Sequence, residues 1–514
     1  MRKTLLLFIA CTGVSLSGQA QAPEMKIVTA SAEALGGRER ILAIRTLRIE
    51  GYGQLASQMG GGNITSSPDA PQKWINITDH ERTIDLANGR SRVRQRNVTG
   101  FVFARLANYG RVRANQVVDG AVAYNVGADG KAVRASNAVA KTRRLEMRAN
   151  PIAIVRTALA PGTKLSNLRT AGDVQTLDIT TQDGDQMTLA VERANNLPAW
   201  VSWVARDENL GDVTFRTSFF GYDRTGGVLL PMGYTTKIDW RDLKLQTLMV
   251  DRNSVDVAVD DMAAPADVRS APAPNPQPAA KAAVLAPGVW FITGGSHNSV
   301  VFEFADHLTL FEAGQSNAWA KAAIDLARTL SPKPLTEVIV SHHHFDHTGG
   351  LRTAIAEGLT VITHRGNAGI IREMAERKST VDADQLGRNP KPLKITLMDD
   401  RMTLKDSAME VQLVRVVQNN HMVHAIAAYV PRDRLLVQAD MFVLDWDFQW
   451  WGAGYNATLK EYDLQVDRDV PVHGGVVPFS EIGPNNEKQF RNAQALCDDG
   501  FKAGFPVPGC PAKP

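Results

Sequence analysis

The run Ser341–Gly350, SHHHFDHTGG, constrains this 514-residue chain more than any other feature. It follows the apolar segment LTEVIV, which is typical of a buried strand, and precedes a segment with helical periodicity. Alternate residues of an extended loop point to the same side, so His342 and His344 can share one metal ion. Asp346 and His347 stand at the helix entry and can reach a second ion. Because imidazole is the commonest protein metal ligand, this run predicts a metal site.

Residues far along the chain extend this prediction. Ten of the 11 histidines lie after residue 283, which places the chemistry in that half of the chain. His421, Asp440 and His473 each come shortly after an apolar segment of strand character. Layered α/β folds place their functional loops at strand ends, so these three residues are further metal-ligand candidates.

A Pro- and Ala-rich run at 263–283 divides the chain, and we expect it to form an extended linker. Residues 23–262 alternate polar and apolar positions and are rich in Thr, Val and aromatic residues, which predicts a large antiparallel sheet. Residues 284–514 alternate strand and helix patterns, which predicts layered α/β structure. The predicted fold class is therefore α+β, with a β-rich domain in front.

Residues 1–22 have the features of a secretory signal peptide, with Arg2 and Lys3 ahead of a short apolar run and small residues. We therefore expect a periplasmic or secreted protein. The formal net charge is only +3, and two of the positive charges, Arg2 and Lys3, belong to the expected signal peptide. The rest of the chain is therefore almost neutral and has no electrostatic reason to bind nucleic acid. No other segment is long and apolar enough to predict a membrane span. Cys497 and Cys510 are expected to form a disulfide, with two free thiols as the alternative.

These motifs resemble those of the metallo-β-lactamase superfamily. The matched residues are HHHFDHTGG, His421 ahead of YVPRDRLL, the strand-terminal Asp440 and the PVHG around His473, in the family's order. The resemblance implies an αββα sandwich within residues 284–514. It also implies two metal ions, the first held by His342, His344 and His421, the second by Asp346, His347 and His473, with Asp440 bridging them.

The resemblance also implies a reaction. Nitrogen and oxygen donors without thiolate suit two Zn²⁺ ions, with Fe or Mn as alternatives. Such a pair of ions makes a hydroxide nucleophile from a shared water, and Asp346 is the expected catalytic residue that orients it. We therefore expect the hydrolysis of an ester, lactone, amide or phosphoester in a small molecule.

Residues beside these motifs complete the predicted site. Glu312 stands where the family often has Asp, and its longer side chain can still brace the histidine loop. The candidate substrate contacts are Asn298, His424, Trp450 and Tyr455. Asn298, with its neighbour His297, belongs to a loop that approaches the metals in this fold, and Tyr455 is a candidate oxyanion donor. For His424 the alternative is an ordinary strand position, and for Trp450 it is core packing.

The N-terminal segments carry no metal spacing and no nucleophile motif. The opening AEALGG and the strands that follow it resemble periplasmic lipoprotein-carrier half-barrels, at the level of the fold alone. We favour a structural or docking role for this sheet. A lipid-binding protein with purely structural metals is the alternative.

Two other activities occur in the superfamily. A β-lactamase acting on β-lactam antibiotics is disfavoured because the zinc-binding cysteine of one major branch is absent and no basic residue soon follows Asp440. An iron-dependent oxidoreductase is disfavoured because the flavin-linked di-iron type typically has Glu where His344 stands. A nuclease is disfavoured by the short stretch between His347 and His421, which leaves no room for the extra domain of those enzymes.

Overall fold

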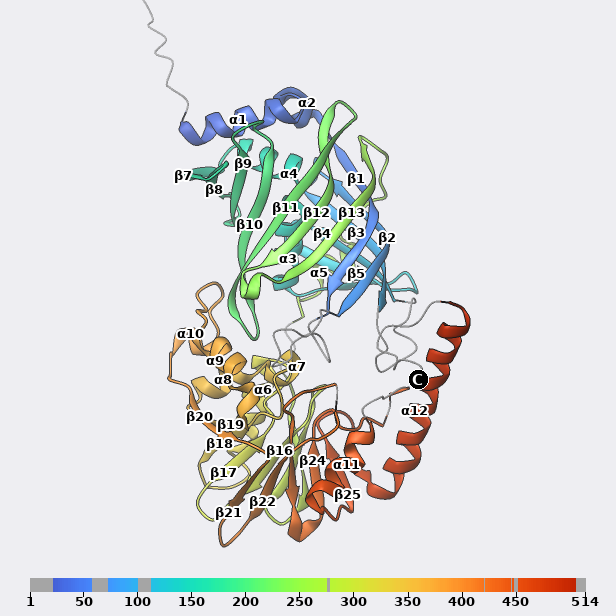
Figure 1. The fold of residues 1–514 in the computed structure, drawn as a ribbon. Helices are drawn as coiled ribbons and strands as arrows, with labels where there is room; N and C mark the ends of the chain where they lie inside the picture. Colours follow the sequence, from blue (N-terminus) through green and yellow to red (C-terminus); the bar gives the residue numbers. More distant parts are fainter. Residues whose placement is uncertain are drawn as a thin grey trace, which may run out of the picture.

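The structure is a computed structural model that describes residues 22–57, 73–99, 112–274, 278–419, 421–444, 446–447 and 452–504. The predicted signal peptide up to residue 21, Trp450 and Cys510 lie outside these ranges. Cys497 is disulfide-bonded. Within the described ranges, no helix has the length and apolar character needed to cross a bilayer. Figure 1 shows an N-terminal part (residues 22–274) stacked above a C-terminal part (residues 278–504).

Thirteen of the described strands form one antiparallel sheet in the N-terminal part, as the alternating sequence pattern predicts. They are β1 (Thr46–Ala56), β2 (Trp74–Asp85), β3 (Arg90–Thr99), β4 (Val112–Asp119), β5 (Val122–Val126), β6 (Ala132–Arg134), β7 (Lys164–Ala171), β8 (Val174–Thr180), β9 (Gln186–Glu192), β10 (Pro198–Asp207), β11 (Gly211–Thr225), β12 (Val228–Ile238) and β13 (Lys244–Val255). Their order is β6-β5-β4-β3-β2-β1-β13-β12-β11-β10-β9-β8-β7, so the first and last strands in sequence meet in the middle.

One face of this sheet packs against four helices. They are α1 (Pro23–Leu35), α2 (Arg38–Ala43), α3 (Asn137–Arg148) and α4 (Pro151–Leu159). Leu47 and Ile49 alternate with more exposed neighbours in β1 and share a core with Leu35 and Ile152 of the helices. The break between α1 and α2 falls at Gly36, which has a φ of +134°; a Cβ there would lie 2.6 Å from Gly227 O in the β11–β12 turn.

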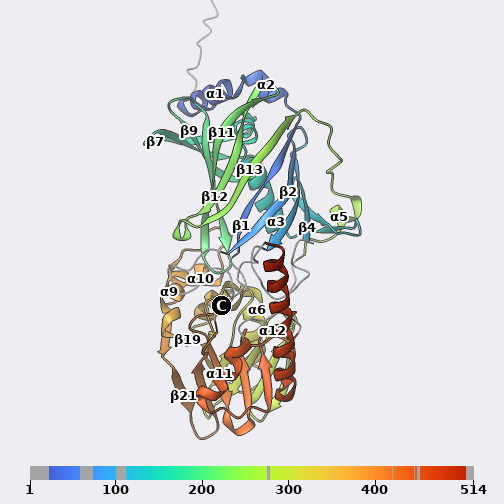
Figure 2. The same ribbon diagram turned by 45° about the vertical axis from the view of Figure 1, so that its right-hand side comes forward.

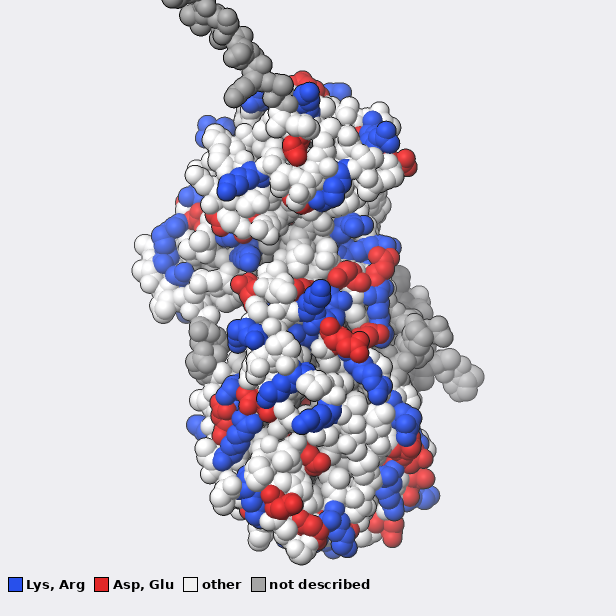
Figure 3. Space-filling view, turned by 90° about the vertical axis from the view of Figure 1, so that its left-hand side faces the viewer, with Lys and Arg blue, Asp and Glu red and all other residues white. Residues whose placement is uncertain are grey.

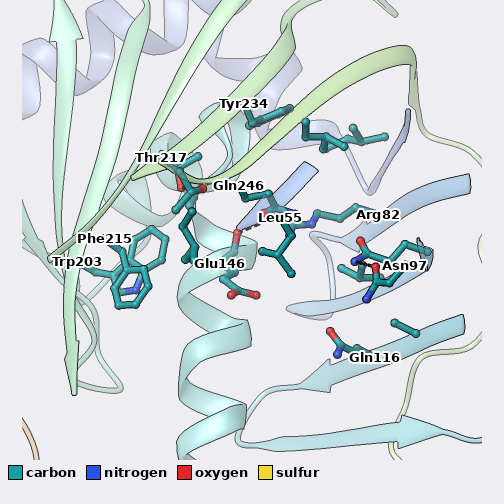
Figure 4. Close-up of a pocket in the computed structure, with 18 residues that line it drawn as sticks. Leu55, Arg82, Asn97, Gln116, Glu146, Trp203, Phe215, Thr217, Tyr234 and Gln246 are labelled. Carbon is teal, nitrogen blue, oxygen red and sulfur yellow. Dashed lines mark hydrogen bonds between the residues drawn. The ribbon is translucent and has the colours of Figure 1, made fainter. Parts of the chain in front are cut away.

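The N-terminal sheet and α3 enclose a cavity of about 260 Å³, shown in Figure 4. Trp203 of β10 and Phe215 of β11 stack at one side of it, with ring centroids 5.6 Å apart. Arg82 lies on the other side, and Glu146 projects from α3. Burial raises the pKa of Glu146. Every residue that lines this cavity belongs to the N-terminal part.

The predicted extended linker contains regular structure at both ends. Helix α5 (Ala266–Ser270) packs against the N-terminal sheet through the buried Val268, and Arg269 forms an ion pair with Asp119. Strand β14 (Lys281–Ala286) begins inside the predicted linker. The ends of the linker are ordered because Val268 makes an apolar contact, Arg269 forms an ion pair and β14 pairs with β15. The domain boundaries themselves stay predictions.

The C-terminal part contains two mixed sheets. The first has the order β14-β15-β16-β17-β18-β19-β20, the second β21-β22-β23-β24-β25-β26. Their remaining strands are β15 (Val289–Thr293), β16 (Ser299–Glu303), β17 (Leu308–Phe311), β18 (Leu335–Ile339), β19 (Thr360–His364), β20 (Lys394–Met398), β21 (Arg401–Lys405), β22 (Glu410–Arg415), β23 (Ile426–Val430), β24 (Leu435–Gln438), β25 (Arg468–Pro471) and β26 (Val477–Pro478).

Helices cover the outer face of each sheet, which gives the expected αββα sandwich (Figure 1). The first sheet carries α6 (Asn317–Ala327), α7 (Phe345–Thr348), α8 (Leu351–Ala356), α9 (Ala368–Glu376) and α10 (Gln385–Arg388), and the second carries α11 (Ala453–Tyr462) and α12 (Phe479–Lys502). Phe302 and Ile339 of the first sheet pack with Leu413 and Val437 of the second in the central core. The predicted fold class is confirmed.

The two parts meet where the β10–β11 hairpin reaches α7 and α9 (Figures 1 and 2). Leu210 and Val213 of the hairpin, and Trp240 after β12, belong to one apolar cluster with Phe345 and Leu351 of the C-terminal part. On the face shown in Figure 3, basic and acidic side chains are intermixed over both parts. The shared apolar cluster shows that apolar packing is continuous between the two parts.

Candidate metal centre

The histidine run lies directly after β18 and leads into α7. Backbone pairing continues past the end of this strand, since Val340 N donates to Ile362 O at 2.9 Å. Residues 342–348 are all buried. His343 points away from its neighbours, as expected for alternate residues, and its Nδ1 lies 3.1 Å from Asn367 Oδ1. The strand and the short helix thus present His342, His344 and the residues of α7 toward the space between the sheets.

A first group of four buried side chains can hold a metal ion. It consists of His342, His344, His421 and Asp440, each of which offers one donor atom within 4.8 Å of the others. His342 Nε2 lies 2.9 Å from His344 Nδ1, and His421 Nε2 lies 2.9 Å from Asp440 Oδ2. Donors at about 2.1 Å from a tetrahedral ion are about 3.4 Å apart, so these separations suit one metal.

A second group lies beside the first. It consists of His297, Asp346, His347 and His473, with the same 4.8 Å limit between donor atoms. His347 Nε2 lies 3.7 Å from Asp346 Oδ2. Asp440 belongs to the first group but also contacts this one, because its Oδ1 lies 3.1 Å from His473 Nε2 and its Oδ2 3.3 Å from His347 Nε2. The structure therefore brings together all seven side chains predicted as metal ligands, with Asp440 between the two groups.

His297 was not among the predicted metal ligands. It lies in the loop between β15 and β16, and its Nε2 is 3.4 Å from Asp346 Oδ2. Its ring packs edge-on against that of His473, with centroids 4.3 Å apart. The sequence could have indicated His297, because this histidine stands in a short loop between two segments of strand character.

Strand ends position the later donors. His421 follows β22, Asp440 comes two residues after β24, and His473 comes two residues after β25. Asp440 has a left-handed backbone with φ of +60°, which turns the chain sharply at the end of its strand. Asp and Asn tolerate this conformation better than other side chains.

Glu312 braces the histidine loop, as predicted. This fully buried residue follows β17 and has a left-handed φ of +66°. Its Oε1 accepts a hydrogen bond from Ser341 N at 2.7 Å, and its Oε2 accepts one from His347 Nδ1 at 3.1 Å. The second bond fixes the His347 tautomer, so that Nε2 presents its lone pair to the donor groups.

Burial and neighbouring charges shift the pKa values of the two donor groups in different directions. Burial lowers the pKa of His342 and of His344 well below the ordinary value, and neighbouring imidazoles lower both further. Burial also lowers the pKa of His347, but the carboxylates of Asp440 and Asp346 outweigh it and raise that pKa. Burial raises the pKa of Asp440, yet the surrounding imidazoles hold it well below its usual range. A metal ion takes the place of the proton on such imidazoles.

A buried carboxyl group, Asp469 in β25, supports the segment that carries Asp440. Gln438 Nε2 donates to Asp469 Oδ2 at 3.0 Å and to Phe442 O at 2.9 Å. Burial raises the pKa of Asp469 to about 7. An unfolded aspartic acid ionises near pH 4, so the folded chain binds this proton more tightly between about pH 4 and 7. Stability therefore falls as the pH rises through that range, by at most about 4 kcal/mol.

Two of the predicted substrate contacts are hydrogen-bonded within the protein, and their contact with a substrate stays a prediction. Asn298 is buried, and its amide group donates to Pro471 O at 3.2 Å and to Gly474 O at 2.6 Å, which fixes the loop around His473. Tyr455 is fully buried, and its hydroxyl donates to Asp469 Oδ1 at 3.0 Å inside the protein. Both residues stabilise the backbone near the donors.

The other two candidates stay predictions. His424 has a left-handed φ of +62°, and its ring stacks on that of His364 with centroids 4.6 Å apart. It lines an open cleft with Asn419 and Met422, outside both donor groups. Trp450 lies outside the described residues.

A small cavity of about 210 Å³ opens beside His473. It is lined by residues of the loops that carry the donors and of the segments beside them, namely Ser296, Phe442, Val443, Leu444, Trp446, Pro471, His473, Gly474, Gly475 and Val477. The Trp446 ring lies 6.4 Å from that of His421 and 6.5 Å from that of His473. The aromatic segment after Asp440 thus supplies at least one side chain at the edge of the donor groups.

Comparison with known proteins gives one family match. The model of the metallo-beta-lactamase superfamily matches residues 292–425. Similar solved structures include a metallo-beta-lactamase from Pontibacter korlensis, with 15% identity over 41% of this chain and 98% of that chain, at a TM-score of 0.32. Another, from Hirschia baltica, has 15% identity over 41% and 98% of the two chains, at a TM-score of 0.32.

A stereoselective inverting sec-alkylsulfatase from Pseudomonas sp. has 18% identity over 44% of this chain and 43% of that chain, at a TM-score of 0.32. No curated protein matches this chain. The family match spans both the histidine run and His421, and the structure adds Asp440 and His473 to the same centre. Residues 292–425 therefore match the metallo-beta-lactamase superfamily, which supports this superfamily for the C-terminal half of the chain.

Proposed function

We propose that the C-terminal part is a hydrolase that uses two divalent metal ions to cleave an ester, lactone, amide or phosphoester in a small molecule. The observation that carries this proposal is the convergence of two buried donor groups on one shared carboxylate, Asp440. A structural metal site is usually closed by four donors, whereas paired sites with a bridging carboxylate are typical of hydrolytic chemistry.

The residues fit two zinc ions. The predicted set consists of five imidazoles and two carboxylates, and it contains no thiolate. Such donors suit Zn²⁺, and Fe or Mn is the alternative. The described donor separations of 2.9–3.7 Å are close to the value of about 3.4 Å that tetrahedral zinc requires.

Metal ions held by these donors would lower the pKa of a bound water to about 7 and so would supply a hydroxide nucleophile. The protein residues arrange what surrounds that water. Asp440 contacts both donor groups and so sets their spacing. Asp346 is the proposed catalytic residue. Its carboxylate belongs to the second group and can orient a water by accepting a hydrogen bond from it. Glu312 holds His347 in the tautomer that exposes Nε2.

The cavity beside His473 supports a small substrate. Its volume of about 210 Å³ can hold a compact group next to the reactive bond, and Trp446 and His473 line it. The composition of the first 22 residues further supports export to the periplasm or beyond the cell, which we propose as the location of this activity.

Metal quantification combined with a substrate panel tests this function. We expect the purified protein to hold two zinc ions per chain and to turn over at least one of a set of chromogenic esters, lactones, phosphodiesters and cephalosporins. A chelator should abolish turnover, and added Zn²⁺ should restore it. Bound iron that changes colour under oxygen would instead favour the oxidoreductase, and a chain without stoichiometric metal would refute the proposal.

Matched variants sharpen the test. His344→Ala and Asp346→Ala should reduce the bound metal or abolish turnover, because each removes one donor from a different group. His307→Ala is the control, since His307 lies between β16 and β17 and pairs with Asp306, outside both groups. Loss of activity in the control alone would contradict the assignment.

A further inference from the structure

The turn between β10 and β11, residues 207–211, contacts the helix that carries two of the metal ligands. Asn209 at its tip is buried, with 5% of its surface exposed. Its Nδ2 donates to Phe345 O at 2.9 Å and to Thr348 Oγ1 at 2.8 Å. The Thr348 hydroxyl in turn donates to His344 O at 2.9 Å. One side chain of the N-terminal part is thus bonded to both ends of α7.

Helix α7 depends on such outside contacts. It spans only Phe345–Thr348, and no side chain caps its N-terminus. A single helical turn is unstable by itself, because fixing several residues for one hydrogen bond costs more conformational entropy than the bond returns. Asp346 and His347 lie between the two groups that Asn209 bonds, so any shift of this helix moves both of these donors relative to His473.

The turn itself is held rigidly. Asp207 Oδ1 accepts hydrogen bonds from Asn209 N and Leu210 N, both at 2.9 Å. Gly211 has a φ of +64°, and a Cβ there would lie 2.3 Å from Lys378 O. Arg377 Nε donates to Leu210 O at 2.7 Å. The side chain of Asn209 is therefore presented from a backbone that has little freedom to move.

Neighbouring contacts fix the turn to the C-terminal part as a whole. Trp240 packs against Phe345 with ring centroids 5.6 Å apart. Glu208 Oε2 accepts a hydrogen bond from Asn317 N at 3.1 Å, at the start of α6. Asp212 accepts hydrogen bonds from Thr380 N at 2.9 Å. Two of these contacts come from Glu208 and Asp212, close to Asn209 in sequence, so the position of Asn209 is set relative to the C-terminal sandwich.

We propose that Asn209 is a positioning residue of the metal centre: the N-terminal part holds the backbone of α7 through this side chain and so fixes the donors of Asp346 and His347. This inference rests on the proposed function, because it requires that the two donor groups bind metal. It gives the N-terminal sheet a defined role, in which the sheet completes the support of the metal centre.

Zinc affinity of the full-length protein tests the proposal without relying on activity. Metal-free protein is titrated with Zn²⁺ in competition with a chromophoric chelator. In Asn209→Ala, we expect one of the two sites to bind zinc at least about tenfold more weakly, the usual effect of removing a group that orients a metal ligand. Asn209→Asp should be at least as weak, because a carboxylate has no proton to donate to Phe345 O.

The matched control is Asn253→Ala. Asn253 is a buried asparagine of β13 that donates to Pro231 O at 3.1 Å within the N-terminal part. Its removal should lower the melting temperature while both zinc affinities stay within twofold of wild type. If Asn209→Ala does not fold, Thr348→Val removes the hydrogen bond between Asn209 and Thr348 and leaves the one to Phe345 O, and it should weaken the same site.

The outcomes separate the two proposals. If the wild type binds no zinc, the proposed function fails. If the wild type binds two ions and Asn209→Ala binds both with unchanged affinity, the function stands and the positioning role is overturned. Equal losses in Asn209→Ala and Asn253→Ala would also overturn it, because they would show general destabilisation.

Discussion

Replacing Glu312 by Gln changes one atom and tests how the second donor group is organised. Glu312 accepts hydrogen bonds from Ser341 N at 2.7 Å and from His347 Nδ1 at 3.1 Å, and both donors carry hydrogen. A glutamine can accept only one of them. If its oxygen faces Ser341, its NH₂ group faces His347 Nδ1, which must then become an acceptor and move its proton to Nε2, the atom that faces Asp440.

The opposite orientation of the amide places two N–H donors against each other at Ser341, which costs about 1–3 kcal/mol for a buried group. Either way His347 is a poorer ligand. We expect zinc affinity at one site of Glu312→Gln to fall by about 10–100-fold, equivalent to about 1.4–2.7 kcal/mol. The other site, which does not include His347, should keep its affinity to within a few-fold.

Chelator competition on metal-free protein measures both affinities. Glu337→Gln is the control, because Glu337 in β18 accepts a hydrogen bond from Thr309 at 2.9 Å and lies 3.6 Å from His307, outside the donor groups. It should bind zinc as the wild type does. If Glu312→Gln retains both affinities within twofold, the tautomer of His347 does not matter for metal binding and the reasoning is refuted.

Two further predictions concern residues near the donors. His297→Ala should weaken zinc binding at one site in chelator competition while the other is kept, since His297 lies 3.4 Å from Asp346; unchanged affinity at both sites would limit His297 to a contact with the substrate. Asp469→Asn should flatten the fall in unfolding free energy between about pH 4 and 7, measured by denaturant titration, because an amide keeps the hydrogen bond from Gln438 without ionising. An unchanged pH slope would place the titrating group elsewhere.

Much of the metal centre could be predicted because its first donors are neighbours in sequence. His342, His344, Asp346 and His347 stand within six positions, and strand periodicity decides which of them share a side. The single donors that follow were found because apolar strands precede them. Asp440 needed one further condition, a left-handed backbone at the strand end, which aspartate tolerates.

The supporting residues could not be predicted in the same way. Asn209 stands 133 positions before His342, in a turn whose sequence, DENLG, reads as an ordinary hairpin connection. Its partners in α7 are a backbone carbonyl and a threonine hydroxyl, and neither contact can be recognised in the sequence. Tyr455 is predicted as an oxyanion donor, and the sequence does not show that its hydroxyl donates a hydrogen bond to the buried Asp469.

The fold of the N-terminal part followed from its alternating pattern, whereas the strand order did not. Period-two alternation predicts strands and the face that each buries, but it does not say that β1 pairs with β13 at the middle of the sheet. The Pro- and Ala-rich run was predicted to be free because it lacks periodicity. Val268 and Arg269 nevertheless find an apolar cluster and an acidic partner on the sheet.

The β10–β11 turn packs among α6, α7 and α9, and these contacts affect how firmly the two parts are held together. The peptide connection at residues 271–281 is not what keeps the halves together, because buried apolar contacts and hydrogen bonds already join them. If a protease cleaves the chain there, we expect the two fragments to remain associated and to elute together. Expression of the C-terminal part alone would expose the apolar surface that Leu210 and Trp240 cover in the whole chain. We expect such a fragment to aggregate.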